Sequence, residues 1–263
     1  MQNYARSLKS YLDTLVLKYN QPGFIADDPI SIPHRFSKKQ DIEISALWTA
    51  LIAWGQRKTI LKNADLLMEW MDGSPHQFVL QHHENDRKKF LNFKHRTFNG
   101  EDAIHFLEFF QSYYRENESL EAAFAGGLQK SDLHVGPALM SFKSEFKKFL
   151  PFAGRTLKHI ASPETGSRCK RLLMFLRWLV RKDKAGVDFG IWTNISPAQL
   201  LLPLDVHVEQ SARKLGLLSR KQADWKAVLE LSDHCRAFSP NDPASYDFAL
   251  FGLGLEQKAN FNI

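Results

Sequence analysis

The chain has 263 residues, with 35 Lys and Arg against 29 Asp and Glu, so its formal net charge is +6 at pH 7. Its hydrophobic fraction of 44% is that of an ordinary globular protein, which excludes disordered and collagen-like classes. Two cysteines exclude a disulfide framework, a multi-cysteine zinc site and a four-cysteine iron–sulfur cluster. No run approaches the roughly eighteen apolar residues of a membrane span, and the first residues lack a secretory signal. The sequence therefore predicts a cytoplasmic protein with no membrane partner.

Apolar residues recur at helical spacing through most of the chain, beginning with an amphipathic N-terminal segment. Further helices are predicted at about 42–54, 61–68, 103–110, 138–149, 172–180, 206–215, 222–231 and 244–251. No convincing alternating strand is present, and Pro203 argues against a strand in the apolar run 200–204. These patterns indicate an all-α fold with irregular connections around residues 85–102 and 183–198.

Positive charge is concentrated between residues 168 and 184. This segment holds seven cations and one aspartate, a net charge of 7 − 1 = +6, so the rest of the chain is neutral. A neutral body with one basic segment suits an anionic partner such as a nucleic-acid backbone, although a solvated helix face is the simpler alternative. Helical geometry puts Lys170, Arg177 and Arg181 on one stripe, opposite the leucines. We expect this stripe to face a groove or solvent.

Lys170 stands at the start of the helix 172–180, after the turn at residues 163–167, whose Ser167 is a suitable N-cap. Free backbone N–H groups and the helix dipole make a first turn suited to a phosphate and unfavourable for an ammonium. A lysine there has a reason for a lowered pKa, which an amine nucleophile needs. Lys170 is therefore a candidate nucleophile or phosphate contact, and a solvated lysine is the alternative.

Asp205 follows an apolar stretch and precedes the helix 206–215. An aspartate in that position is most often an N-cap. A carboxylate held at a helix start could also stabilise a cationic sugar transition state or orient a water molecule. His207 is a candidate base, but no second His or Cys stands at metal-ligand spacing, so a structural histidine is favoured and no metal site is predicted.

Three blocks of the sequence, at residues 167–172, 202–208 and 240–252, resemble an uncharacterised bacterial family that is known only as a domain of unknown function. The resemblance covers nearly the whole chain. It is specific, but it implies no activity.

The chain also resembles, more remotely, the helix-hairpin-helix DNA glycosylase superfamily. The segment 51–59 is similar to the superfamily's turn that enters the space left by an extruded base, which implies this role for Gln56. Lys170 matches the lysine that attacks the sugar in bifunctional members, and the segment 204–207 is similar to the one that carries the superfamily's aspartate, here Asp205. The residues implied to contact DNA are Gln56, Arg57, Lys58, Gly166, Ser167, Arg168 and Arg171.

The chain departs from this superfamily in three respects. Residues 163–167 keep one glycine where the superfamily's hairpin typically has two. The interval from Lys170 to Asp205 is 205 − 170 = 35 residues, which is longer than usual. The C-terminal cysteine cluster of many members is missing, so the resemblance implies no iron–sulfur cluster and no other cofactor.

The expectation is an all-α, two-lobed, helix-hairpin-helix glycosylase-like protein that forms a single globular unit over residues 1–263. The resemblance implies a central helical lobe at about 45–200 and a second lobe from 1–44 plus 201–263, with DNA held between them. The implied function is DNA repair by cleavage of the N-glycosidic bond of a flipped, damaged nucleotide, with Asp205 and Lys170 as catalytic residues. The rivals are a non-catalytic nucleic-acid-binding protein of the same fold and a helical scaffold protein.

Overall fold

The computed structural model describes residues 2–260, and the chain divides into two compact units. Unit 1 consists of Met1–Ala26, Ser131–Val135 and Pro163–Ile263, and unit 2 of Asp27–Lys130 and Gly136–Ser162. The described residues are mostly helical and pair as strands only in one two-stranded hairpin, which confirms the prediction of an all-α protein. Residues 163–200, which were expected in the central lobe, lie in unit 1.

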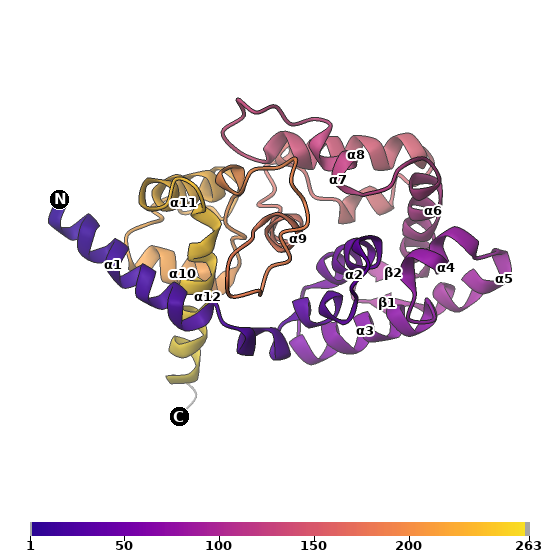
Figure 1. Cartoon of the computed structure of the whole chain (residues 1–263), viewed down its shortest axis with the longest axis horizontal. Coiled ribbons are helices and arrows are strands. Elements are labelled where there is room, and N and C mark those ends of the chain that lie inside the picture. The colour runs from indigo at the N-terminus through magenta and orange to yellow at the C-terminus, as the bar shows by residue number, and fades with distance from the viewer. Residues whose placement is uncertain (1, 261–263) are drawn as a thin grey trace. The chain divides into compact units, whose positions relative to one another are not determined.

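Unit 2 is a set of helices joined by short 3-10 turns and the hairpin (Figure 1). Its elements in chain order are η2 (Pro29–Ser31), η3 (Pro33–Arg35), α2 (Lys39–Ile52), α3 (Arg57–Trp70), α4 (Pro75–Gln81), α5 (Glu84–Arg87), η4 (Lys88–Asn92), β1 (Lys94–His95), β2 (Phe98–Asn99), α6 (Gly100–Glu116), α7 (Glu121–Ala125), α8 (Gly136–Phe149) and η5 (Thr156–His159).

Helix α2 lies at the centre of the core of unit 2. Every residue in the range 42–52 is buried, whereas the sequence pattern predicted one buried face. The ring of Trp48 lies 5.6 Å from the ring of Phe106, and each fully buried side chain of this size stabilises the fold by roughly 1.5–3 kcal/mol. Glu43 is tolerated in this core because its carboxylate accepts a hydrogen bond from the Tyr114 hydroxyl at 2.8 Å.

The hairpin of β1 and β2 was not predicted, because each strand has only two residues and shows no alternation. The strands are antiparallel, with Lys94 opposite Asn99. Asn99 also caps α6: its side chain accepts a hydrogen bond from the Asp102 backbone N–H at 3.2 Å, and the Asp102 carboxylate accepts from the Asn99 N–H at 2.9 Å. This reciprocal pair satisfies two backbone donors at the helix start and fixes where the hairpin joins α6.

Unit 1 contains the N-terminal helix and the C-terminal part of the chain (Figure 1). Its elements are α1 (Gln2–Tyr19), η6 (Pro163–Thr165), α9 (Lys170–Val180), η7 (Pro197–Gln199), α10 (Val206–Lys214), α11 (Trp225–Phe238), η8 (Pro243–Ser245) and α12 (Tyr246–Asn260), and η1 (Pro22–Asp27) leads from α1 toward unit 2.

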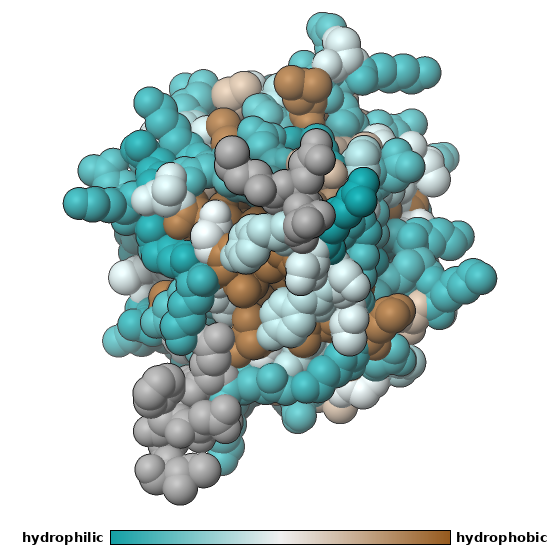
Figure 2. Space-filling view, turned by 90° about the vertical axis from the view of Figure 1, so that its left-hand side faces the viewer, coloured by the Kyte–Doolittle hydropathy of each residue, from teal (hydrophilic) through white to brown (hydrophobic). Residues whose placement is uncertain are grey.

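Helix α1 is amphipathic, as predicted, and packs along α12. Leu8, Leu12 and Leu15 are buried at the spacing of one helix face. The contact requires a glycine on α12, because a Cβ atom at Gly252 would lie 2.4 Å from the ring of Tyr19. The end of unit 1 that carries α1 shows apolar residues near its middle, framed by hydrophilic ones (Figure 2).

Helix α9 is buried on all sides and carries a charged residue into the core. The Arg177 side chain is 4% exposed and forms ion pairs with Asp188, at 3.2 Å, and with Asp247 of α12. Its guanidinium carbon also lies 4.3 Å from the ring centroid of Phe248. Three groups therefore compensate the desolvation of one cation.

Arg181, at the end of α9, is the second buried cation, with 3% of its side chain exposed. Its guanidinium lies 2.6 Å from Asp183, 3.1 Å from Asp188 and 2.9 Å from Asp242. Together with Arg177 it forms a buried ionic network of two arginines and four aspartates.

This network corrects the expectation that Arg177 and Arg181 share an open stripe with Lys170. The two arginines face carboxylates that come from residues 183–188, from the start of η8 and from α12. The helical spacing was right, but the face that it defines is covered by aspartates, from Asp183, which is next but one to Arg181, to Asp247, which is 70 residues from Arg177. The positive charge of the segment is therefore largely compensated in space.

We predict that Arg181→Ala lowers the free energy of unfolding by about 3–5 kcal/mol, because it leaves buried aspartates without their partner. Urea unfolding followed by circular dichroism measures the loss. Lys184→Ala, at an exposed position next to the network, is the control and changes the stability by about 0.5 kcal/mol or less. Equal effects of the two substitutions would contradict a structural role of the network.

Candidate functional site

The start of α9 places Lys170. Cys169 occupies the N-cap position with a φ of 49°, in the left-handed region, and Lys170 is the first residue of the helix. The predicted cap, Ser167, lies two residues earlier, where its hydroxyl accepts a hydrogen bond from the Cys169 N–H at 3.3 Å. The N-cap is therefore Cys169 and not the predicted Ser167. The predicted location of Lys170 in the first turn is confirmed.

Asp205 is the N-cap of α10, as the local sequence predicted. One carboxylate oxygen, Oδ1, accepts hydrogen bonds from the backbone N–H groups of His207 and Val208, both at 2.9 Å. Two of the free donors of the helix start are thereby satisfied, and the orientation of the carboxylate is fixed. This arrangement directs Oδ1 to the helix.

The structure brings Lys170 and Asp205 together, although 35 residues separate them in the chain. The Lys170 ammonium nitrogen Nζ lies 4.0 Å from Asp205 Oδ2, the oxygen that the cap does not use. The same nitrogen lies 3.4 Å from the sulfur atom of Met174. The side chains of Lys170 and Asp205 are 23% and 22% exposed. A ligand can therefore reach both from solvent, although most of each side chain is buried.

Asp247 adds a second carboxyl group that interacts electrostatically with Lys170 and Asp205, and it was not singled out from the sequence. Burial raises its pKa to about 6, and the negative charge of Asp205 acts in the same direction, while Arg177 and Lys170 oppose the shift. A carboxyl group with a pKa in this range can exchange protons near neutral pH. The signal in the sequence was an aspartate between Tyr246 and Phe248 at the apolar start of a helix.

The basic residues around Lys170 differ in their surroundings. The Arg168 guanidinium lies 3.9 Å from the carboxylate of Glu209, so it links the start of α9 to α10. Burial lowers the pKa of Arg171 to about 10. Gly166 has a φ of +72° and open space at its missing Cβ atom, so the glycine is needed for the backbone turn and not for a close approach.

Gln56, Arg57 and Lys58 belong to unit 2 and are all exposed. Gln56 is the N-cap of α3, but its side chain makes no capping hydrogen bond. Arg57 and Lys58 are the first two residues of that helix. The turn therefore presents one uncharged polar side chain and two cations to solvent.

His207 serves the packing of unit 1. Its ring meets the ring of Phe251 edge-on at 5.9 Å. A Cβ atom at Gly254 would lie 2.8 Å from the His207 Cβ atom, so α10 and α12 approach each other closely at this point. The contact supports the structural interpretation of His207 and fixes the start of α10, where Asp205 lies.

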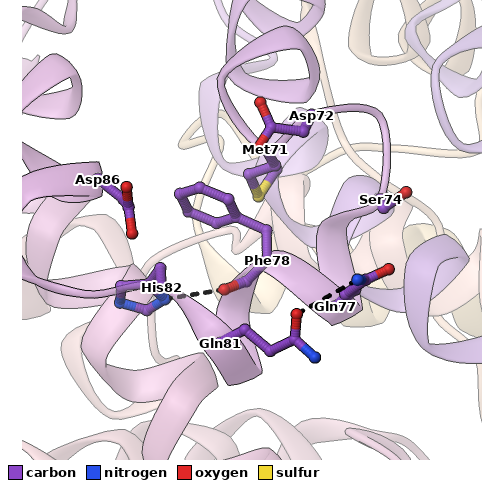
Figure 3. A pocket seen from close by; sticks show the side chains of 8 residues that line it. All are labelled: Met71, Asp72, Ser74, Gln77, Phe78, Gln81, His82 and Asp86. Carbon is purple, nitrogen blue, oxygen red and sulfur yellow. Dashed lines mark hydrogen bonds between the residues drawn. The ribbon is translucent and has the colours of Figure 1, made fainter.

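Unit 2 contains a cavity of about 390 Å³ beside α4 (Figure 3). Polar side chains line most of it, and Met71 and Phe78 provide the apolar part. The His82 ring lies in its wall, with Nδ1 at 3.0 Å from the backbone carbonyl oxygen of Phe78. None of the candidate residues from the sequence lines this cavity.

No group of three or more His, Cys, Asp or Glu in residues 2–260 is arranged to hold a metal ion. No helix in that range is long and apolar enough to span a membrane.

Comparisons with known proteins identify the family of the chain. No curated protein and no solved structure matches the sequence. A family model described as a protein of unknown function, DUF2400, matches residues 28–256. This match covers nearly the whole chain and includes α9, α10 and the start of α12, which carry Lys170, Asp205 and Asp247. The chain therefore belongs to the DUF2400 family of proteins of unknown function.

Proposed function

We propose that this protein is a DNA repair glycosylase-like enzyme that cleaves the N-glycosidic bond of a flipped, damaged nucleotide. The observation that carries the proposal is the distance of 4.0 Å between Lys170 Nζ and Asp205 Oδ2 at a solvent-accessible position of unit 1. An amine and a carboxylate so close together provide a nucleophile and a stabiliser of positive charge for chemistry at a sugar carbon.

Asp205 has one oxygen for each of two roles. Oδ1 is held by the backbone of α10, whereas Oδ2 faces Lys170. As the bond between sugar and base breaks, positive charge develops on the sugar ring, and a fixed carboxylate stabilises that charge without having to reorient. The two N-cap hydrogen bonds therefore fix the orientation of the proposed catalytic carboxylate.

Lys170 provides the amine for a covalent step. The Lys170 ammonium first gives up a proton to water, and the lone pair of the neutral nitrogen then forms a bond to C1′ of the sugar while the bond from C1′ to the base breaks. The base leaves with that electron pair and takes up a proton. The nitrogen then loses a proton, and the bond from C1′ to the ring oxygen breaks as that oxygen takes up a proton, which gives a Schiff base between Lys170 and the sugar.

The residues that hold the DNA in this proposal lie near the start of α9 and at the turn before α3. Arg168 and Arg171 lie on either side of Lys170 in the chain and would contact phosphates, together with the backbone at Gly166 and Ser167. At the other turn, Gln56 would fill the space of the extruded base, and Arg57 and Lys58 would contact the phosphates beside it. No cofactor is required.

A non-catalytic nucleic-acid-binding protein is the alternative, and the double hydrogen bond to Asp205 Oδ1 favours it. The capping role alone is a sufficient reason for an aspartate at this position, with no catalytic role. In this alternative the ion pair between Lys170 and Asp205 only ties α9 to α10.

We predict that Asp205→Asn abolishes base release while the free energy of unfolding changes by no more than about 1 kcal/mol, because asparagine caps a helix almost as well as aspartate. Product analysis on oligonucleotides that each carry a different damaged base measures the activity, and thermal unfolding measures the stability. Asp233→Asn, the same exchange at an exposed position of α11 in the same unit, is the control and retains activity. Full activity of Asp205→Asn would leave the residue as a cap only.

We predict that borohydride traps a covalent adduct between the wild-type protein and a damaged oligonucleotide, and that Lys170→Gln does not form it. The reason is that reduction converts the Schiff base to a stable amine. Gel electrophoresis under denaturing conditions detects the adduct, and Lys214→Gln is the control. Base release without any adduct would make Lys170 a phosphate contact and not a nucleophile.

We predict that the affinity for duplex DNA falls steeply with salt, with a log–log slope of about −0.9 for each phosphate contacted. Arg168→Ala reduces the steepness of that slope by about one contact and weakens binding to all sequences alike. Fluorescence polarisation over a salt series measures both effects. An affinity that does not change with salt would contradict the nucleic-acid proposal in both its forms.

A further inference from the structure

Three segments of unit 2 meet around Trp54, which lies in the turn between α2 and α3. Its ring is stacked on the ring of His95 in β1, with centroids 6.3 Å apart and planes 15° apart. It also meets the ring of His159 of η5 edge-on, at 6.1 Å. The His95 Nε2 atom also lies 3.0 Å from the Trp54 carbonyl oxygen. The turn, the hairpin and η5 are thus held together by one aromatic cluster.

These three segments carry basic residues and no acidic ones, and the nearest carboxylate that they contact is the buried one of Asp102 on α6, which bonds to Thr156 and His159. Residues 53–58, 94–99 and 156–159 contain no aspartate or glutamate. Their cations are all exposed and none makes an ion pair in the described part of the chain: Arg57, Lys58, Lys94, Arg96 and Lys158. We call this set the Trp54 basic surface. Like charges so grouped repel each other unless an anion lies among them.

Arg96 is held in an unusual conformation at the middle of this surface. It lies at the tip of the hairpin with a φ of 56°, in the left-handed region, where Gly, Asn or Asp is the common choice. A Cβ atom at Gly55 would lie 2.7 Å from Arg96 Nη1, so the guanidinium rests against the turn that leads to Gln56. Gly55 itself has a φ of +97°. The backbone thus keeps an arginine beside the turn at a cost in conformational energy.

Helix α3 adds to the attraction for anions. Its first turn has no acidic residue and no side-chain cap, and it begins with Arg57 and Lys58. Free N–H groups and the positive end of the helix dipole therefore point in the same direction as two cations. None of the large apolar side chains exposed in the described part of the chain lies in the three segments, so the surface lacks the groups with which proteins enter a lipid surface.

We propose that the Trp54 basic surface binds the phosphate backbone of duplex DNA, with Arg96 as its central contact. The inference rests on the proposed function and extends it, because Lys94, Arg96 and Lys158 become DNA contacts beside the turn of Gln56. Nucleic acid is the partner that this surface fits, since a row of phosphates offers one negative charge for each of several cations and binding releases their counterions. No base is read, so the contact is independent of sequence.

The test compares Arg96→Gln and Lys158→Gln with Arg115→Gln, measured by fluorescence polarisation on a short undamaged duplex over a salt series. Arg115 is an exposed arginine of unit 2 that lies fifteen residues after Gly100 on α6, about 22 Å along the helix from the hairpin. Arg96→Gln and Lys158→Gln should each reduce the salt slope by about 0.9 and lower the affinity roughly eightfold at 0.1 M salt. Arg115→Gln should match the wild type.

Affinities of Arg96→Gln and Lys158→Gln equal to that of Arg115→Gln would overturn the inference. If base release by the wild-type protein is then still observed, the proposed function stands and only this surface is wrong. If instead the two variants lose affinity for the duplex while no base is released, the surface stands and the enzyme proposal fails. Thermal unfolding checks that the variants are folded. Variants that lose binding to phosphatidylserine vesicles, but not to DNA, would assign the surface to a membrane and overturn the proposal.

Discussion

The structure of unit 1 depends on the requirement that buried charges be paired. Arg177 and Arg181 cannot be buried alone, because the desolvation of an isolated guanidinium costs far more than one helix contact returns. Helix α9 can therefore lie in the core only where the carboxylates of Asp188, Asp242 and Asp247 converge. These aspartates come from a loop, from the start of η8 and from α12, so the network sets the positions of three parts of the chain relative to one helix.

This network also fixes the helices that carry the residues of the candidate site. Lys170 lies on the same helix as Arg177, and Asp205 lies on a helix that packs against α12, which carries Asp247. The amine and the carboxylate are thus mounted on elements that are already fixed to each other through buried groups. Catalytic groups require this kind of support, because small displacements of a reacting group cost much of the rate.

Local patterns in the sequence missed the short helices α4, α5 and α7 but were sufficient for the longer helices and for the N-cap role of Asp205, because spacing and capping act over a few residues. They were insufficient for Arg177 and Arg181, since charge counted along the chain does not show that aspartates up to 70 residues away cover those arginines. The two-residue strands were missed for a similar reason: the pairing of Lys94 with Asn99 leaves no periodic signal. The proximity of Lys170 and Asp205 leaves no local signal either, because 35 residues separate them in the chain.

The pairing of α1 with α12 has a consequence for the order in which the protein is made. Tyr246 donates a hydrogen bond to Asp13 at 2.7 Å across 233 residues of sequence, and Gly252 packs on Tyr19. Helix α1 leaves the ribosome before unit 2, but its partner is synthesised after all of unit 2. Unit 2, which is nearly continuous in the chain, can fold during synthesis. The apolar face of α1, in contrast, stays unburied until α12 has been synthesised. A chain that is stopped before α12 therefore exposes that face to chaperones and to aggregation.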